Sequence, residues 1–220
     1  MLFKRLVDDN AKIWNEYINH EFVKQIENGT LPSENFMFYL KQDYIYLINY
    51  AKCYARLSIN AKTNTELRFA MKFQNYIVEG EMQLHQEILK LGIDTENFSD
   101  FDESILNMAY SRYMLSVGES GDFLDMLIAL AACAVGYGVI GKNIKQRLGK
   151  IPSSHPYKAW IDTYSSDEFL SEVDEFIAFV DSYSNVVNES KFSRLSEIFG
   201  NVTRLEVGFW QHGLEMKMQI

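Results

Sequence analysis

The chain has 220 residues, of which 47% are hydrophobic, and its formal net charge is -9. A chain of this length and composition can bury the core of one domain, so disorder is excluded as a description of the whole. The acidic balance, with no run of Lys or Arg, argues against a nucleic-acid partner, because such binding relies on basic patches.

Apolar residues recur with helical spacing along the chain, and only 3 Pro and 12 Gly interrupt it. The pattern predicts an opening helix from Phe3 to Tyr17, then a stop and restart between Gly29 and Ser33. Further helices are predicted over residues 34–60, 65–91, 103–117, 123–148, 157–164, 168–187 and 192–218, with an acidic loop over 94–102. No strand alternation of useful length is found, so we predict an all-α, single helical domain spanning residues 1–220.

The opening sequence, the cysteines and the longest apolar stretch indicate the cellular compartment. The opening sequence MLFKRLVDDNAKIW lacks an apolar leader, so no secretion is expected. The two cysteines, Cys53 and Cys133, do not make a disulfide framework. The longest apolar stretch, residues 126–140, is shorter than the roughly 20 residues of a membrane span. We therefore expect a cytoplasmic protein with no membrane partner.

Asp43 interrupts an almost wholly apolar and aromatic helix, FMFYLKQDYIYLI. Tyr39, Asp43, Tyr46 and Tyr50 follow a spacing of four, three and four, so they share one helix face. A helix that is apolar on nearly all sides is buried, and a buried carboxylate needs compensating partners. The alternative is a solvent-facing stripe that carries an ordinary surface Asp.

Cys133 lies in the uncharged segment 126–140, four residues before Tyr137, and therefore on the same helix face as that tyrosine. A free cysteine in an apolar helix is more often a small structural hydrophobe than a nucleophile. Cys53 has the same structural interpretation, and nothing in its surroundings favours another.

Glu206 falls inside the apolar stripe of the last predicted helix, between Val202 and Phe209. A carboxylate in such a place has a raised pKa and can carry protons near neutral pH, unless it reaches outward from the edge of the stripe. Asp43, Cys133 and Glu206 thus lie on three helices whose apolar faces converge on one cavity in a bundle.

Two Glu-x-x-x-His pairs, Glu16/His20 and Glu81/His85, are the candidates for a metal site. We interpret both as surface pairs with helical spacing. The paired Glu-x-x-His motifs of di-iron bundles and Gly-rich phosphate loops are both missing from the sequence, and no metal or cofactor is expected.

Several blocks, in order along nearly the whole chain, resemble the thiaminase II (TenA) family. The first and most specific block comprises His20-Glu21-Phe22-Val23, Gly29-Thr30-Leu31, Phe36, Tyr39 and residues 42–47. Supporting matches are Ala109-Tyr110 to Tyr113-Met114, Cys133 with Tyr137, Trp160-Ile161 to Tyr164-Ser165-Ser166 with Glu168-Phe169, and Glu206 to Phe209-Trp210.

The resemblance implies a helical bundle of the haem-oxygenase-like type, usually a homotetramer. It implies hydrolysis of thiamin, or of its breakdown product aminomethyl-aminopyrimidine, to hydroxymethylpyrimidine in thiamin salvage, without a cofactor. By the same resemblance Cys133 is the nucleophile and Glu206 the acid/base, and Asp43 holds the aminopyrimidine edge. Tyr46, Tyr110, Tyr137 and Tyr164 would line the pocket.

Two stretches differ from the family pattern, namely the small residues Ala134-Val135-Gly136 and the ending Phe-Trp-Gln-His-Gly. Both bear on the volume of the pocket and hence on the preferred substrate. Two other classes of function stay open: a metal-dependent oxidase of the haem-oxygenase-like type, and a non-catalytic pyrimidine-binding protein.

Overall fold

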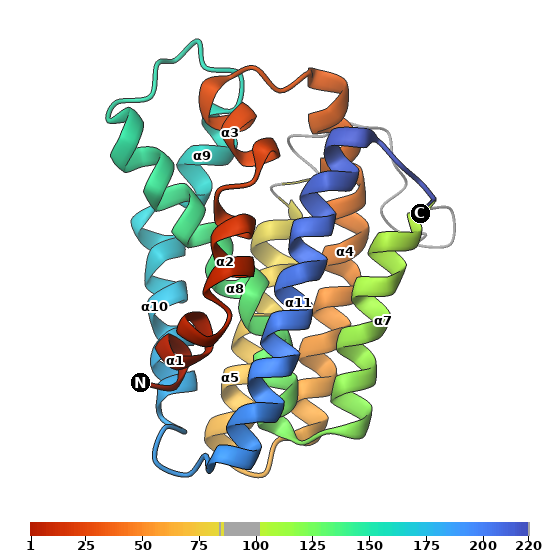
Figure 1. Ribbon diagram of the computed structural model, residues 1–220, viewed down its shortest axis with the longest axis vertical. Helices are drawn as coiled ribbons and strands as arrows, with labels where there is room; N and C mark the ends of the chain where they lie inside the picture. The colour runs from red at the N-terminus through yellow and green to blue at the C-terminus, as the bar shows by residue number, and fades with distance from the viewer. Residues whose placement is uncertain (84, 86–101, 220) are drawn as a thin grey trace. The chain divides into compact units, whose positions relative to one another are not determined.

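The computed structural model describes residues 1–83, 85 and 102–219, and every regular element in these ranges is helical (Figure 1). In chain order the elements are α1 (Leu2–Asp9), α2 (Ala11–Ile18), α3 (Glu21–Asn28), α4 (Ser33–Asn60), α5 (Asn64–Tyr76), the π-helix η1 (Ile77–Glu81), α7 (Ile105–Ser120), α8 (Phe123–Leu148), α9 (Lys158–Tyr164), α10 (Asp167–Asp181) and α11 (Glu189–Glu215).

The described residues group into two compact units. One comprises residues 1–31 and 127–211, in which α1 packs against α2 and α10, and α9 packs against α10. The other comprises residues 32–126 and 212–220, in which α4 packs against α5, η1 and α7. Two of the three divisions along the chain fall inside α8 and α11, and the third lies between α3 and α4. The single domain expected from the sequence stays a prediction.

Most helices begin where a side chain satisfies free backbone N–H groups. Thr63 and Glu66 form a capping box at the start of α5. Ser104 caps α7, and Ser166 caps α10. At the other end of α3, Gly29 adopts the left-handed conformation with φ of 67° that commonly terminates a helix. The sequence therefore sets most helix limits locally.

The opening helix differs from the prediction, because it breaks at Asn10 into α1 and α2. The Asn10 amide donates to the Leu6 carbonyl at 3.0 Å and to Ser196 Oγ at 2.9 Å. Such side-chain bonds compete with the helical backbone pattern. The short helix α3 after it was also not foreseen as a separate element.

The predicted helix over 168–187 ends early, at Asp181. Asp181 Oδ1 accepts from the backbone N–H of Phe3 at 2.8 Å, and Ser184 Oγ accepts from that of Leu2 at 2.9 Å. The end of α10 and the turn after it thus supply acceptors for the free N–H groups of α1.

Residues 65–102 also differ from the prediction, while α7 ends three residues later than predicted and α11 begins and ends three residues earlier. The predicted 65–91 helix starts as α5 and continues as η1, whereas its end at Gly92 and nearly all of the acidic loop lie outside the described residues. The helices predicted over 34–60 and 123–148 agree with α4 and α8.

Helix α8 is the most apolar element. Within the described ranges it alone is long and apolar enough to cross a membrane by length and composition, with a mean hydropathy of 2.1 in its most apolar window. However, 89% of that window is buried within the protein. Such burial is typical of a core helix, as expected from the sequence.

Candidate functional site

Asp43 lies on α4 with only 2% of its surface exposed. Its Oδ2 atom accepts a hydrogen bond from the hydroxyl of Tyr39 at 3.0 Å and lies 2.7 Å from Nε2 of His85. The buried carboxylate therefore has the polar partners that its place in an aromatic helix requires. Both of these bonds use Oδ2, and neither uses Oδ1.

His85 is buried, with 1% of its surface exposed, so its interpretation as part of a surface pair with Glu81 is wrong. Its Nδ1 atom lies 2.9 Å from the main-chain oxygen of Glu81, and its Nε2 atom faces Asp43. Burial lowers the pKa of His85, but the hydrogen bond and negative charge of Asp43 outweigh burial and raise this pKa above its ordinary value.

His20, the histidine of the other pair, is half-buried and caps α3. Its Nδ1 atom accepts from the backbone N–H of Phe22 at 3.2 Å. Burial holds the pKa of His20 below its ordinary value. Within residues 1–83, 85 and 102–219, no group of three or more His, Cys, Asp or Glu side chains could hold a metal ion.

Aromatic rings from α4 and α7 gather in the same unit as Asp43. The rings of Tyr46 and Tyr110 lie 4.9 Å apart, and Tyr46 stacks on Tyr50 at 5.3 Å. Gln42, next to Asp43, fixes α7 in place, because its Oε1 accepts from the Ser104 backbone at 2.9 Å. This short stretch of α4 thus supplies both the carboxylate and the anchor of the helix that carries Tyr110.

A second aromatic cluster lies in the other unit. The ring of Tyr137 on α8 lies 4.8 Å from Tyr164, 6.1 Å from Trp160 and 5.3 Å from Trp210 on α11. Two of the predicted pocket tyrosines, Tyr137 and Tyr164, are therefore in contact.

Cys133 and Glu206 lie beside this cluster in sequence, each one helical turn before a member of it. Cys133 precedes Tyr137 on α8, and Glu206 precedes Trp210 on α11. They are 7% and 2% exposed. The helices α8 and α11 meet where the rings of Tyr137 and Trp210 touch, and both helices run in the same direction in Figure 1. The residues one turn earlier, Cys133 and Glu206, therefore lie at the same level of the two helices.

The environment of Cys53 makes its thiol unreactive. Its side chain is fully buried, and burial raises the pKa of its thiol to about 12. A thiol with that pKa is protonated at neutral pH and is a poor nucleophile. The structural interpretation of Cys53 is consistent with this environment.

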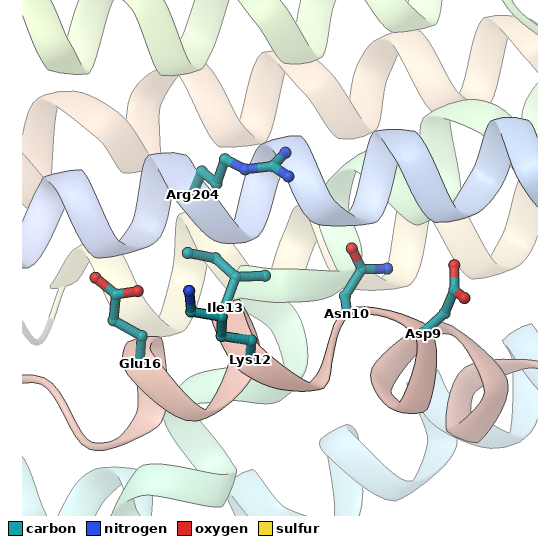
Figure 2. A pocket seen from close by; sticks show the side chains of 6 residues that line it. All are labelled: Asp9, Asn10, Lys12, Ile13, Glu16 and Arg204. Atoms are coloured by element: carbon teal, nitrogen blue, oxygen red, sulfur yellow. The ribbon is translucent and has the colours of Figure 1, made fainter.

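The structure also contains a surface groove that sequence patterns did not indicate (Figure 2). It has a volume of about 350 Å³ and is lined by Asp9, Asn10, Lys12, Ile13, Glu16 and Arg204. None of the predicted site residues lines it. Its charges have both signs, and its lining lacks a thiol or imidazole that could act as a nucleophile.

The role of His85 as the partner of Asp43 was not predicted from the sequence. In a regular helix Glu81, which lies four residues after the buried Ile77, would face the core. The buried residues are instead Met82 and His85. The π-helical turn of η1 shifts the register by one residue, and such turns are frequent at functional sites.

Comparison with known proteins identifies the family. Residues 8–216 match the TENA/THI-4/PQQC family. A protein of Halalkalibacterium halodurans named aminopyrimidine aminohydrolase is 34% identical over 215 residues, which cover 97% of this chain and 95% of that protein.

Solved structures agree with this match. A Silicibacter protein described as a TenA family transcription regulator superimposes with a TM-score of 0.89 and 36% identity, over 97% of this chain and 96% of that chain. A Shewanella denitrificans domain with a heme oxygenase-like fold superimposes with a TM-score of 0.71 and 15% identity, over 97% of this chain and 92% of that chain. The all-α, haem-oxygenase-like fold is confirmed, and the chain belongs to the TENA/THI-4/PQQC family.

Proposed function

We propose that the protein is an aminopyrimidine aminohydrolase of thiamin salvage, which converts aminomethyl-aminopyrimidine to hydroxymethylpyrimidine and also cleaves thiamin. The observation that carries this proposal is the similarity over 97% of the chain to a relative named for that activity. The buried carboxylates, thiol and tyrosines supply groups suited to it.

In this proposal the Cys133 thiolate attacks the pyrimidine ring. Glu206 gives a proton to a ring nitrogen and so stabilises the adduct. Addition interrupts the aromaticity of the ring, so that the ring electrons can expel ammonia from the protonated aminomethyl group, or the neutral thiazole from thiamin. Water then adds to the methylene carbon and loses a proton to the solvent, the thiolate leaves, and the ring nitrogen returns its proton to Glu206. Water replaces ammonia or the thiazole, and no redox change occurs.

Asp43 is proposed to hold the amino edge of the pyrimidine. Its Oδ2 atom is occupied by Tyr39 and His85. Its Oδ1 atom can accept a hydrogen bond from an exocyclic amino group. Tyr46, Tyr110, Tyr137 and Tyr164 would provide flat aromatic walls for the ring, since buried aromatic pairs favour stacked and edge-to-face contacts. The proposal places the enzyme in the cytoplasm as a homotetramer.

The direct test measures ammonia release from aminomethyl-aminopyrimidine beside the cleavage of thiamin, using the purified chain. We expect turnover of at least one of the two. Cys133→Ser should lose nearly all turnover and still bind hydroxymethylpyrimidine in calorimetry. The matched control is Cys53→Ser, which removes the other buried thiol and should remain active. Near wild-type turnover by Cys133→Ser would contradict the covalent mechanism.

A non-catalytic pyrimidine-binding or regulatory role is the second candidate, because one similar structure is described as a transcription regulator. The same experiment separates the two functions. Binding of hydroxymethylpyrimidine by the wild-type chain, with no turnover of either substrate, would favour the regulatory role.

A further inference from the structure

Both ring nitrogens of His85 face hydrogen-bond acceptors. Nδ1 lies 2.9 Å from the main-chain oxygen of Glu81, and Nε2 lies 2.7 Å from Asp43 Oδ2. A main-chain carbonyl oxygen can only accept, so Nδ1 must carry a proton. An ionised carboxylate also only accepts, so Nε2 carries a proton as well whenever Asp43 is ionised.

Two further observations favour an ionised Asp43 and therefore a cationic ring. The Nε2–Oδ2 separation lies in the range of about 2.7–2.9 Å typical of a hydrogen bond between charged groups. The same Oδ2 atom also accepts from the hydroxyl of Tyr39. A carboxylate oxygen readily accepts two hydrogen bonds, whereas the hydroxyl oxygen of a neutral acid is a weaker acceptor.

We propose that His85 is a positioning residue for Asp43, acting as a buried imidazolium that fixes Oδ2 and leaves Oδ1 to accept a hydrogen bond from an amino group of the ligand. The class of ligand rests on the proposed function, whereas the ionic pair rests on the contacts alone. The groups that face the pair are the hydroxyl of Tyr39 from α4 and, from η1, the main-chain oxygen and the negative charge of Glu81.

The arrangement restrains the carboxylate from two directions. Tyr39 lies one turn before Asp43 on the same helix, and His85 approaches from a different element. Two directional bonds to one oxygen limit rotation of the carboxylate about its bond to Cβ. A preoriented acceptor costs less conformational entropy when a ligand binds than one that must first be ordered.

The experiment compares His85→Gln with His85→Leu. The Gln variant keeps a neutral N–H donor in its side chain. The Leu variant has a side chain of similar size but lacks both the donor and the charge. We expect His85→Leu to weaken binding of hydroxymethylpyrimidine roughly tenfold or more, as for loss of a charge-assisted contact, and His85→Gln to recover part of that loss. Calorimetry measures the binding, and circular dichroism checks that each variant is folded.

A spectroscopic measurement does not depend on ligand or turnover. In ¹⁵N-labelled wild-type protein at pH 7.5, both ring nitrogens of His85 should show the chemical shifts of a protonated imidazolium. In Asp43→Asn they should show those of a neutral ring. A neutral His85 ring in the wild type would overturn the proposal.

The two proposals fail in different ways. If the wild-type chain neither binds nor converts the pyrimidines, the proposed function is wrong, and the nitrogen spectra still decide the ionic pair. If the wild type turns over and a folded His85→Leu binds hydroxymethylpyrimidine as tightly as wild type, the positioning role alone is wrong.

Discussion

Glu206 is a carboxylate with 2% exposure on a helix face that also buries Val202 and Phe209. Replacing it by Gln keeps the shape and removes the transferable proton. We expect Glu206→Gln to lower kcat by roughly 10²–10⁴-fold, which is the usual contribution of general acid–base catalysis. The assay is ammonia release, with binding of hydroxymethylpyrimidine measured in parallel. Unchanged kcat would remove Glu206 from the proposed mechanism.

The raised pKa of His85 predicts a dependence of stability on pH. Between the ordinary value of 6.5 and the higher folded-state value, the folded protein binds the proton more tightly than the unfolded chain does. The stabilisation is therefore complete below the ordinary value and is lost as the pH rises through the folded-state pKa. Urea denaturation across this pH range should show the decline in the wild type and a smaller one in His85→Gln. Equal slopes would contradict the prediction.

The residues of the candidate site differ in how well sequence reasoning could place them. Burial of Asp43 was one of two interpretations that the sequence allowed, and it was favoured by the apolar and aromatic residues on nearly all sides of this part of α4. Burial of His85 could not be predicted, because a regular helical period puts Glu81 on the inner face. The relation of Cys133 to Glu206 depends on how two distant helices pack, which local patterns do not specify.

Helix α8 depends on close packing of small residues. A Cβ atom at Gly136 would lie 2.6 Å from Cζ of Tyr17, so the ring of Tyr17 from α2 occupies the space beside the glycine. Gly136 is one of the small residues that depart from the family pattern. The volume that it leaves is thus filled, at least on this side, by Tyr17.

This contact predicts the effect of Gly136→Ala. Ala has the higher helix propensity, but a crowded core typically loses about 1–3 kcal/mol on overpacking, so we expect net destabilisation. The control is Gly80→Ala, since a Cβ atom at Gly80 meets nothing within 4 Å. Urea denaturation of both variants tests the comparison. A Gly136→Ala protein as stable as wild type would show that Tyr17 moves aside without cost.

Helix limits were predictable where a local signal sets them and not where a distant contact does. The span of α8 follows from its uninterrupted apolar run, and a Gly ends α3. In contrast, Asn10 breaks the opening helix through a bond to Ser196 on α11, and α10 stops where Asp181 bonds to α1. Sequence windows contain no information on such partners, which are more than 170 positions away.

The prediction that the whole chain forms a single domain can be tested by unfolding. Two of the three divisions between the compact units fall inside α8 and α11, so each of these helices would have to break for one unit to unfold alone. We expect one cooperative transition, with coincident curves from circular dichroism and from tryptophan fluorescence. Two separated transitions would instead indicate two domains.

The homotetramer proposed from the family resemblance has its own test. Light scattering at micromolar concentration should give about four times the chain mass of 25.6 kDa. Because association stabilises the folded chain by mass action, Tm should also rise with protein concentration. A mass of one chain with a constant Tm would reject the tetramer.

The π-helical turn of η1 can be viewed as the mark of a one-residue insertion in an ancestral α-helix. Removing one residue between 77 and 81 would restore a regular helix and place the histidine seven residues after Ile77, on the same helix face, so that it still points toward Asp43. Regularising the helix without such a deletion would instead rotate the imidazole of residue 85 by about 100°, away from Asp43. Homologues that lack the inserted residue would need their histidine one position earlier relative to α5 to keep this contact, so alignments of η1 should show insertion and histidine position changing together.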